Sequence, residues 1–118
     1  MKLTKALLPG KVLYKHKDIP VFSPWVAVDA YKKVESAFDG NVRLYDPFCG
    51  NGVTISTMQA LNNNQLEHIY GSDITDYALE TTQKNLQILT KDGIEQRIKE
   101  LRQKNSEGIA ENLQKYIN

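Results

Sequence analysis

The sequence predicts an α/β fold in which helices alternate with parallel strands. Three observations support this prediction: apolar residues switch between helical and extended spacing along the chain, a glycine loop joins a short apolar strand to a helix, and a second strand ends at Asp73. An order of helix, strand, helix, strand, helix needs crossover connections, and these place the strands parallel to each other. The 118 residues suit one domain.

The composition fits a globular protein of the cytoplasm. Hydrophobic residues make up 41% and charged residues 25% of the chain, which is an ordinary mixture for a soluble domain. The net charge of +1 neither requires nor excludes a nucleic-acid partner. Cys49 is the single cysteine, so an intrachain disulfide is excluded. No apolar run approaches the roughly 18 residues that span a bilayer, and we expect no membrane partner.

Residues 1–22 are predicted to form a basic N-terminal arm. Five lysines and His16 fall within the first 17 residues, and the stretch 12–14, between two turn signals, predicts a short strand. Two interpretations remain open for the lysines. They either keep a solvated arm soluble, or they contact the phosphates of RNA or DNA.

Residues 23–92 are predicted to form the α/β core. Ser23 can cap a helix whose first residue is Pro24. Trp25 is predicted to be a packing residue, with stacking on a substrate as the alternative. A strand over 42–45 precedes the glycine loop, a helix over 53–62 follows it, and a second strand covers 69–72. The apolar face of the first helix is predicted to consist of Ala27, Tyr31, Val34 and Phe38, and that of the second of Ile55, Met58 and Leu61.

A third helix is predicted to begin after a Thr75 cap, and a helical extension to cover 93–118. The buried stripe of the third helix is predicted to be Ala78, Leu79, Thr82, Leu86 and Leu89. Apolar residues keep helical spacing beyond Gly93, but Asn105 and Gly108 interrupt the pattern. We therefore expect either one long or two shorter amphipathic helices there.

The chemistry is expected in the loop Asp46–Gly52 and at Asp73, 27 residues after Asp46. Glycines let a backbone turn sharply and let a ligand approach closely. The helix start that follows offers unpaired N–H donors and partial positive charge. A carboxylate at the end of the second strand can accept hydrogen bonds from ribose hydroxyls. These features predict a site for a nucleoside cofactor.

The spacing of the glycines favours S-adenosylmethionine over a dinucleotide. Dinucleotide sites use a third glycine for close helix packing beside the pyrophosphate, and Ile55 stands at that position here. S-adenosylmethionine has no pyrophosphate and carries an ammonium group. Asp46, at the end of the first strand, is a suitable counter-charge for that group.

Two motifs resemble those of class I S-adenosylmethionine-dependent methyltransferases. Asp46–Gly52 resembles the first motif, in the form typical of enzymes that act on nucleic acid, and Gly71–Ile74 resembles the second. From Phe22–Pro24 through the helical tail, the chain is similar to the avilamycin-resistance (AviRa-like) type of bacterial rRNA guanine methyltransferase. The resemblance covers the N-terminal portion of that family's domain. It implies a Rossmann-like fold, S-adenosylmethionine as cofactor, rRNA or another nucleic acid as partner of the complete enzyme, and a helical insertion at 93–118.

The same resemblance assigns the site residues one by one. Asp46 and the backbone of Cys49, Gly50 and Gly52 would surround the methionine part of the cofactor. Asp73 would hold the ribose hydroxyls, and Ile74 would lie against the adenine. Cys49 is interpreted as a small residue in a crowded loop, with a nucleophilic role as the less favoured alternative. One cysteine and two scattered histidines give no metal-ligand spacing, so no metal site is expected.

The sequence lacks the later Pro-Pro-Tyr or Leu-Pro-Tyr motif that positions the target base in methyltransferases of this type, so catalytic residues are not identified. Two or three strands also make an incomplete sheet with open edges. Three explanations fit: a truncated gene product, half of a split domain completed by a partner chain or by self-association across the open sheet, or a small stand-alone module. The rival to the methyltransferase function is therefore a non-catalytic nucleotide- or S-adenosylmethionine-binding module that acts through a partner chain.

Overall fold

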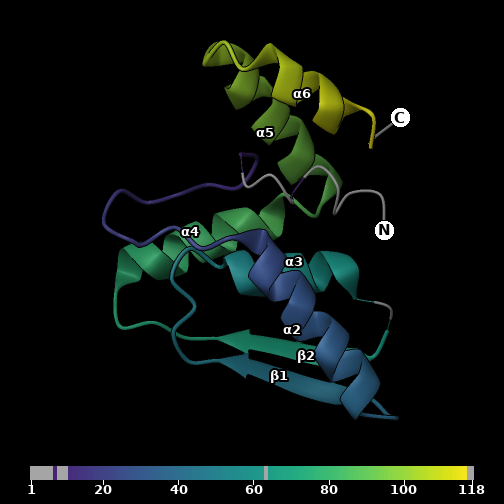
Figure 1. The fold of residues 1–118 in the computed structure, drawn as a ribbon. Helices are drawn as coiled ribbons and strands as arrows, with labels where there is room; N and C mark the ends of the chain where they lie inside the picture. Colours follow the sequence, from purple (N-terminus) through teal and green to yellow (C-terminus); the bar gives the residue numbers. More distant parts are fainter. Residues whose placement is uncertain (1–6, 8–10, 63, 117–118) are drawn as a thin grey trace.

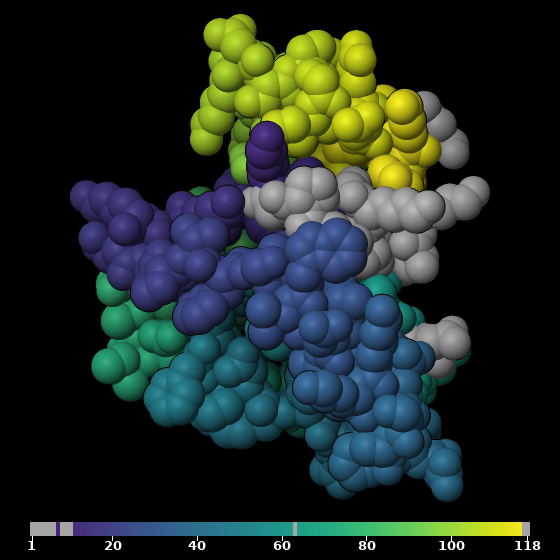
Figure 2. All heavy atoms as spheres, in the orientation of Figure 1, coloured from purple at the N-terminus to yellow at the C-terminus, as the bar shows by residue number. Residues whose placement is uncertain are grey.

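The computed structural model describes residues 7, 11–62 and 64–116. Its elements, in chain order, are α2 (Pro24–Ala37), β1 (Val42–Asp46), α3 (Val53–Leu61), β2 (Leu66–Gly71), α4 (Asp76–Gln87), α5 (Lys91–Gln103) and α6 (Glu107–Gln114). The two strands and the α5–α6 hairpin lie at opposite ends of the molecule, as the ribbon and the space-filling view both show (Figures 1 and 2). Within the described residues, no helix is both long and apolar enough to cross a bilayer.

The two strands are parallel, as predicted, and α2 and α3 pack on one face of them (Figure 1). Tyr31, Met58 and Leu66 form the buried centre of this packing, with Leu44 and Ile69 beside them. β2 begins three residues earlier than predicted. The reason is local, because the Asn62 side chain accepts a hydrogen bond from the backbone N of Leu66 and donates one to its carbonyl, at 3.0 and 2.9 Å.

The opposite face of the sheet carries four exposed side chains. Arg43 lies beside His68 in the register, and Tyr45 lies beside Tyr70. The Tyr45 hydroxyl is 2.7 Å from the Ser72 hydroxyl. Strands of a doubly covered parallel sheet are apolar on both faces, whereas here one face is apolar and the other aromatic and charged.

A second and larger core lies between the sheet layer and the α5–α6 hairpin. The arm contributes Leu7, Val12 and Leu13, all at most 2% exposed. They pack against the following buried residues: Val53 and Ala60 of α3, Ile88 just after α4, Ile94, Ile98 and Leu101 of α5, and Ala110 and Leu113 of α6. The prediction of a strand at 12–14 is wrong. Among the described residues, no strand lies beside the arm for it to pair with, and side chains of α4 and α5 hold it instead.

Arg97 of α5 anchors the arm through its buried side chain. Its Nε donates to the Val12 carbonyl at 2.6 Å, and its guanidinium lies 4.1 Å from the centre of the Tyr14 ring. The Tyr14 hydroxyl donates to Glu100 Oε2 at 2.6 Å, and Arg97 Nη1 pairs with the same oxygen at 3.3 Å. The arm and α5 are thus joined by a cation, a carboxylate and a phenol that satisfy one another.

The last segment forms two helices rather than one. Asn105 has a φ of 59°, in the left-handed region, and this ends α5. The backbone N of Ser106 then bonds to the Leu101 carbonyl at 2.8 Å, which closes the end of the helix. Asn105, noted as an interruption in the sequence, is therefore a helix stop, whereas Gly108 lies inside α6.

Three apolar residues predicted to be buried are exposed: Trp25 (59%), Phe38 (53%) and Leu79 (38%). Phe38 follows α2 in an extended conformation, with φ of −128°, so it leaves the helical face that Ala27 and Tyr31 share. Leu79 is one position away from the buried stripe of α4. That stripe consists of Ala78, Thr81, Thr82 and Asn85, so most of the face that α4 buries is polar.

The hydrogen bond from Tyr14 to Glu100 makes the free energy of unfolding vary with pH in the alkaline range. Burial, followed by the hydrogen bond to Glu100, raises the pKa of the Tyr14 hydroxyl to about 12. The protonated hydroxyl therefore contributes stability fully below about pH 10, the ordinary tyrosine pKa, and the contribution is lost as the pH rises through about 12. We expect Tyr14→Phe to be less stable than the wild type near neutral pH and to lose less stability between about pH 9 and 12.

Urea unfolding midpoints across this pH range measure the effect. Tyr70→Phe, which alters an exposed tyrosine outside this network, is the matched control. Parallel pH profiles for the wild type and Tyr14→Phe would contradict the prediction.

Candidate cofactor-binding site

The glycine loop runs from the end of β1 to the start of α3 and is tied to the end of β2. The backbone N of Ser72 bonds to the Asp46 carbonyl at 3.0 Å, and the N of Cys49 bonds to the Ser72 carbonyl at 2.9 Å. Asp46 Oδ1 accepts from the N of Phe48 at 3.1 Å. The first two of these bonds extend the pairing of β1 with β2 beyond the ends of the strands. The loop and Asp73 therefore lie at the same edge of the sheet.

Gly50 and Gly52 both adopt left-handed φ values, 52° and 75°. A Cβ on Gly52 would lie 2.7–2.9 Å from atoms of Thr82, so this position also allows α4 to approach the loop closely. A Cβ on Gly50 would be 3.3 Å from Ile19 of the arm. The two glycines named from the sequence are therefore required by the backbone and by its neighbours.

Gly71 is a third close-approach glycine, which sequence analysis did not single out for this role. A Cβ there would collide with Cδ1 of Ile55 and lie 3.1 Å from Cβ of Cys49. Ile55 occupies the position where dinucleotide sites carry their third glycine. Close packing between α3 and the sheet is thus kept by placing the small residue on β2 instead of on the helix.

Asp73 joins the two motifs directly. Its Oδ2 accepts from the backbone N of Gly50, and its Oδ1 accepts from both the backbone N and the hydroxyl of Thr75, at 3.0–3.1 Å. The Thr75 amide, then the Thr75 hydroxyl, and also the Gly50 amide lower the pKa of the Asp73 carboxyl below its ordinary value. Thr75 begins α4 as predicted, but its hydroxyl binds Asp73 and does not cap the helix.

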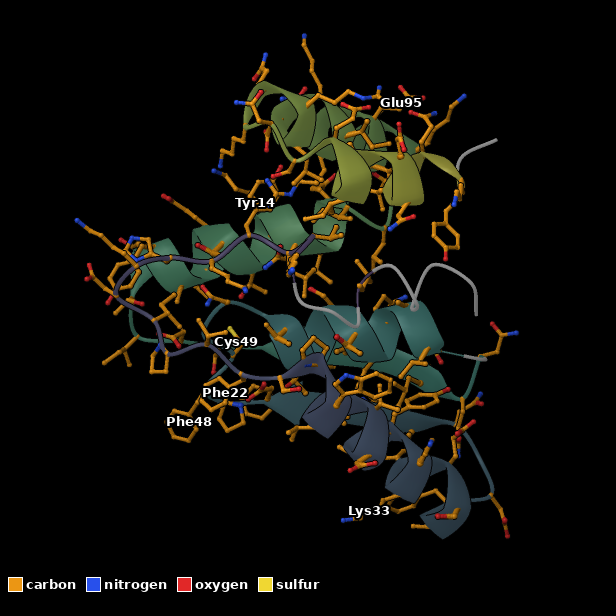
Figure 3. All side chains as sticks on the ribbon, turned by 45° about the horizontal axis from the view of Figure 1, so that its top comes forward. Tyr14, Phe22, Lys33, Phe48, Cys49 and Glu95 are labelled. Carbon is orange, nitrogen blue, oxygen red and sulfur yellow. The ribbon has the colours of Figure 1, made fainter. Side chains whose placement is uncertain are left out.

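The remaining predicted site residues lie around this junction. Cys49 is buried, and its Sγ is 3.5 Å from the Thr82 hydroxyl. Ile74 is fully exposed. Phe48 is also exposed and projects outward from the loop (Figure 3). Among the residues that the structure describes, no group of three or more histidine, cysteine or acidic side chains could hold a metal ion.

Thr82 and Asn85 of α4 also contact the loop, and sequence analysis missed their role. The Thr82 hydroxyl donates to the Gly50 carbonyl at 2.9 Å, and Asn85 Nδ2 donates to the Asn51 carbonyl at 2.7 Å. His16 of the arm also contacts the loop, because its backbone N donates to Asn51 Oδ1 at 3.1 Å. The available signal was the polar residue Thr82 in a stripe predicted to be buried, because a buried hydroxyl needs a partner.

Gly52→Ala should destabilise the chain. A left-handed conformation costs a residue with a Cβ about 1–2 kcal/mol, and the contact with Thr82 adds to that cost. Gly40→Ala is the matched control, since a Cβ on Gly40 would meet nothing within 4 Å. Chemical unfolding of the three proteins measures the difference. Equal stabilities for the two variants would show that the loop does not need a glycine at 52.

Comparison with known proteins identifies the family. The family model "RRNA methyltransferase AviRa" matches residues 3–114. A 23S rRNA (guanine(2535)-N(1))-methyltransferase of Streptomyces viridochromogenes is 30% identical over 96 residues, which are 80% of this chain and 38% of that protein. Two solved structures of the rRNA methyltransferase aviRa from the same organism, at 1.5 and 2.4 Å, align with a TM-score of 0.76 and 26% identity.

Each structural alignment covers 95% of this chain and 49% of the matched chain, so the chain spans less than half the length of these relatives. The likeness confirms the predicted Rossmann-like methyltransferase fold, of which the described residues form a part with two strands. The match over residues 3–114 agrees with the structural alignment and with the motifs at the glycine loop and Asp73. The chain belongs to the AviRa family of rRNA methyltransferases.

Proposed function

We propose that this chain is the S-adenosylmethionine-binding portion of an rRNA methyltransferase. The observation that carries the proposal is the bond from the Gly50 amide to Asp73, which joins the glycine loop to the acid that follows β2. When bound, S-adenosylmethionine supplies the methyl group. The residues of this chain hold and orient it, and positioning of two reactants is itself a large part of catalysis.

The methionine end of the cofactor is assigned to Asp46 and the backbone of Cys49, Gly50 and Gly52. Asp46 Oδ1 is occupied by the Phe48 amide, but within the described part of the chain its Oδ2 has no hydrogen-bond partner. That oxygen suits an ammonium group. The first amides of α3 have no side-chain cap from Gly52, so they are also available as donors.

The nucleoside end is assigned to Asp73 and Ile74. An ionised carboxylate accepts about four hydrogen bonds, and Asp73 already accepts from Gly50 and Thr75. The Ile74 amide also lowers the pKa of this carboxyl, so ribose hydroxyls would replace protein donors there. Ile74, which is 100% exposed, offers an apolar surface that an adenine ring would cover.

Calorimetry with S-adenosylhomocysteine tests the cofactor assignment. We expect the wild type to bind and Asp73→Ala to bind about tenfold more weakly or worse, because a ribose hydroxyl loses its charged acceptor. Asp76→Asn is the matched control, since Asp76 is an acid in the first turn of α4 that makes no bond to the loop. Equal affinities for the wild type and Asp73→Ala would refute the ribose assignment.

The substrate side of the reaction is proposed from the relatives. The relative from Streptomyces viridochromogenes is a methyltransferase that acts on a guanine of 23S rRNA. In this chain, Lys15 and Lys17 remain exposed although the arm that carries them is anchored by Tyr14 and His16. We propose that these two lysines contact RNA phosphates, in addition to the structural role that the arm already has.

We also propose that the open sheet packs against further polypeptide, as a partner chain or a second copy. The exposed aromatic and charged face formed by Arg43, Tyr45, His68 and Tyr70 supports this, as does the greater length of the relatives. An uncovered strand edge readily pairs with another strand. A solution mass above 13.4 kDa by light scattering is expected for self-association, and a monomer that gains mass on mixing is expected for a partner chain.

A methyl-transfer assay distinguishes the two candidate functions, a portion of an enzyme and a non-catalytic binding module. We expect this chain, mixed with a polypeptide equivalent to the part of an AviRa relative that it does not match, to transfer radiolabelled methyl to unmodified 23S rRNA. The Asp73→Ala variant in the same mixture should lose that activity. Cofactor binding without transfer in any mixture would favour the non-catalytic module.

A further inference from the structure

Asn85 is a fully buried polar side chain in the last turn of α4. It is 0% exposed, and its carboxamide makes three hydrogen bonds. Oδ1 accepts from the backbone N of Tyr14 at 2.6 Å, and Nδ2 donates to the Tyr14 carbonyl at 3.0 Å and to the Asn51 carbonyl at 2.7 Å. Both amide hydrogens are therefore used, and the side chain joins the arm to the glycine loop.

These bonds fix the direction of two peptide groups in the loop. The N–H and C=O of a trans peptide point in opposite directions. Because Asn85 holds the Asn51 carbonyl, the N–H of Gly52 points away from α4, where it bonds to the Cys49 carbonyl at 2.7 Å. Because Thr82 holds the Gly50 carbonyl, the N–H of Asn51 also points away from α4. Within the described residues, that N–H has no hydrogen-bond partner.

The arm supports the same loop from the other side of Asn85. The His16 ring stacks on Tyr77 of α4, with 4.2 Å between ring centres, and the backbone N of His16 bonds to the Asn51 side chain. Ile19 lies against Gly50. Asn85 is thus the point at which the arm, α4 and the loop meet, and it is not itself exposed to a ligand.

We propose that Asn85, with Thr82 one turn before it, positions the loop for the methionine end of the cofactor. The inference rests on the proposed function. The two side chains hold the Gly50 and Asn51 carbonyls on the α4 side. The unpaired N–H of Asn51 is thereby directed away from α4 before the ligand arrives, and the N–H of Gly52 closes the loop on the Cys49 carbonyl. Without them, the carbonyls have to turn to find new partners, and the amides turn with them. Part of the binding free energy would then be spent on ordering the loop.

Asn85→Asp is the sharpest variant, since it keeps the size and the acceptor but removes both donors. We expect S-adenosylhomocysteine to bind about tenfold more weakly near neutral pH. A buried carboxyl group is protonated more easily than an exposed one, and its O–H can then donate to the Asn51 carbonyl. The affinity of the variant, relative to the wild type at the same pH, should therefore recover as the pH falls. A purely destabilising substitution would show the opposite trend.

Thr82→Val serves where Asn85→Asp does not fold, because it removes the hydroxyl with little change of shape. Ile98→Val, in the core between the sheet layer and the α5–α6 hairpin, is the control that lowers stability without touching the loop. Amide hydrogen exchange in the absence of ligand gives the second readout. Asn85→Asp and Thr82→Val should speed exchange at residues 49–53, whereas Ile98→Val should not.

The outcomes separate this inference from the proposed function. Unchanged affinity and unchanged loop exchange in both α4 variants would overturn the positioning role while cofactor binding stands. If the wild type binds no S-adenosylhomocysteine, the proposed function fails, and the exchange data alone decide whether α4 orders the loop. If Ile98→Val changed affinity and loop exchange as much as the α4 variants do, Asn85 would contribute only to stability. That result would overturn the inference.

Discussion

The rest of the structure depends on how the backbone carbonyls and amides of the turn between β1 and α3 find hydrogen-bond partners. The carbonyls of Gly50 and Asn51 turn inward toward α4, and buried carbonyls need partners. Gly50 and Gly52 make the turn sterically possible, but they bring no side chain that could supply those partners. The partners come from α4, through Thr82 and Asn85, while Asp73 accepts from the Gly50 amide.

This requirement accounts for the polar stripe of α4 and for the burial of the arm. A helix packed by apolar contacts alone would have leucine on the side that Thr82 and Asn85 occupy, whereas Leu79 is exposed. Asn85 also needs partners for its remaining donor and acceptor, and the backbone of Tyr14 provides both. The Tyr14 side chain then continues to Glu100 and Arg97, so the glycine loop, the arm and α5 form one connected network.

The parts of the fold that follow from local chemistry could be predicted. Pro24 and the Ser23 cap place the start of α2, and the glycines place the loop. Asn105 interrupts the helical pattern, but the sequence leaves open whether one or two helices follow Gly93, and only the structure shows that α5 ends at this interruption. The start of β2 could not be predicted, because it depends on the Asn62 side chain that closes the loop before it. The arm could not be predicted either. Its lysines suggested solvent, but Val12 and Leu13 between them are buried by helices that come at least 40 residues later in the chain.

The sequence by itself determined the fold class and the family motifs, because these depend on residue types at short spacing. The residues proposed for the cofactor follow from the resemblance to the family and stay a prediction. The sequence also indicated an incomplete sheet, in agreement with the two strands described. Only the tertiary structure decided that Asp73 bonds to Gly50, that Gly71 makes room for Ile55, and that Asn85 holds both the arm and the loop. These are contacts between residues far apart in sequence. No local pattern encodes which carbonyl a buried amide reaches once the chain has folded.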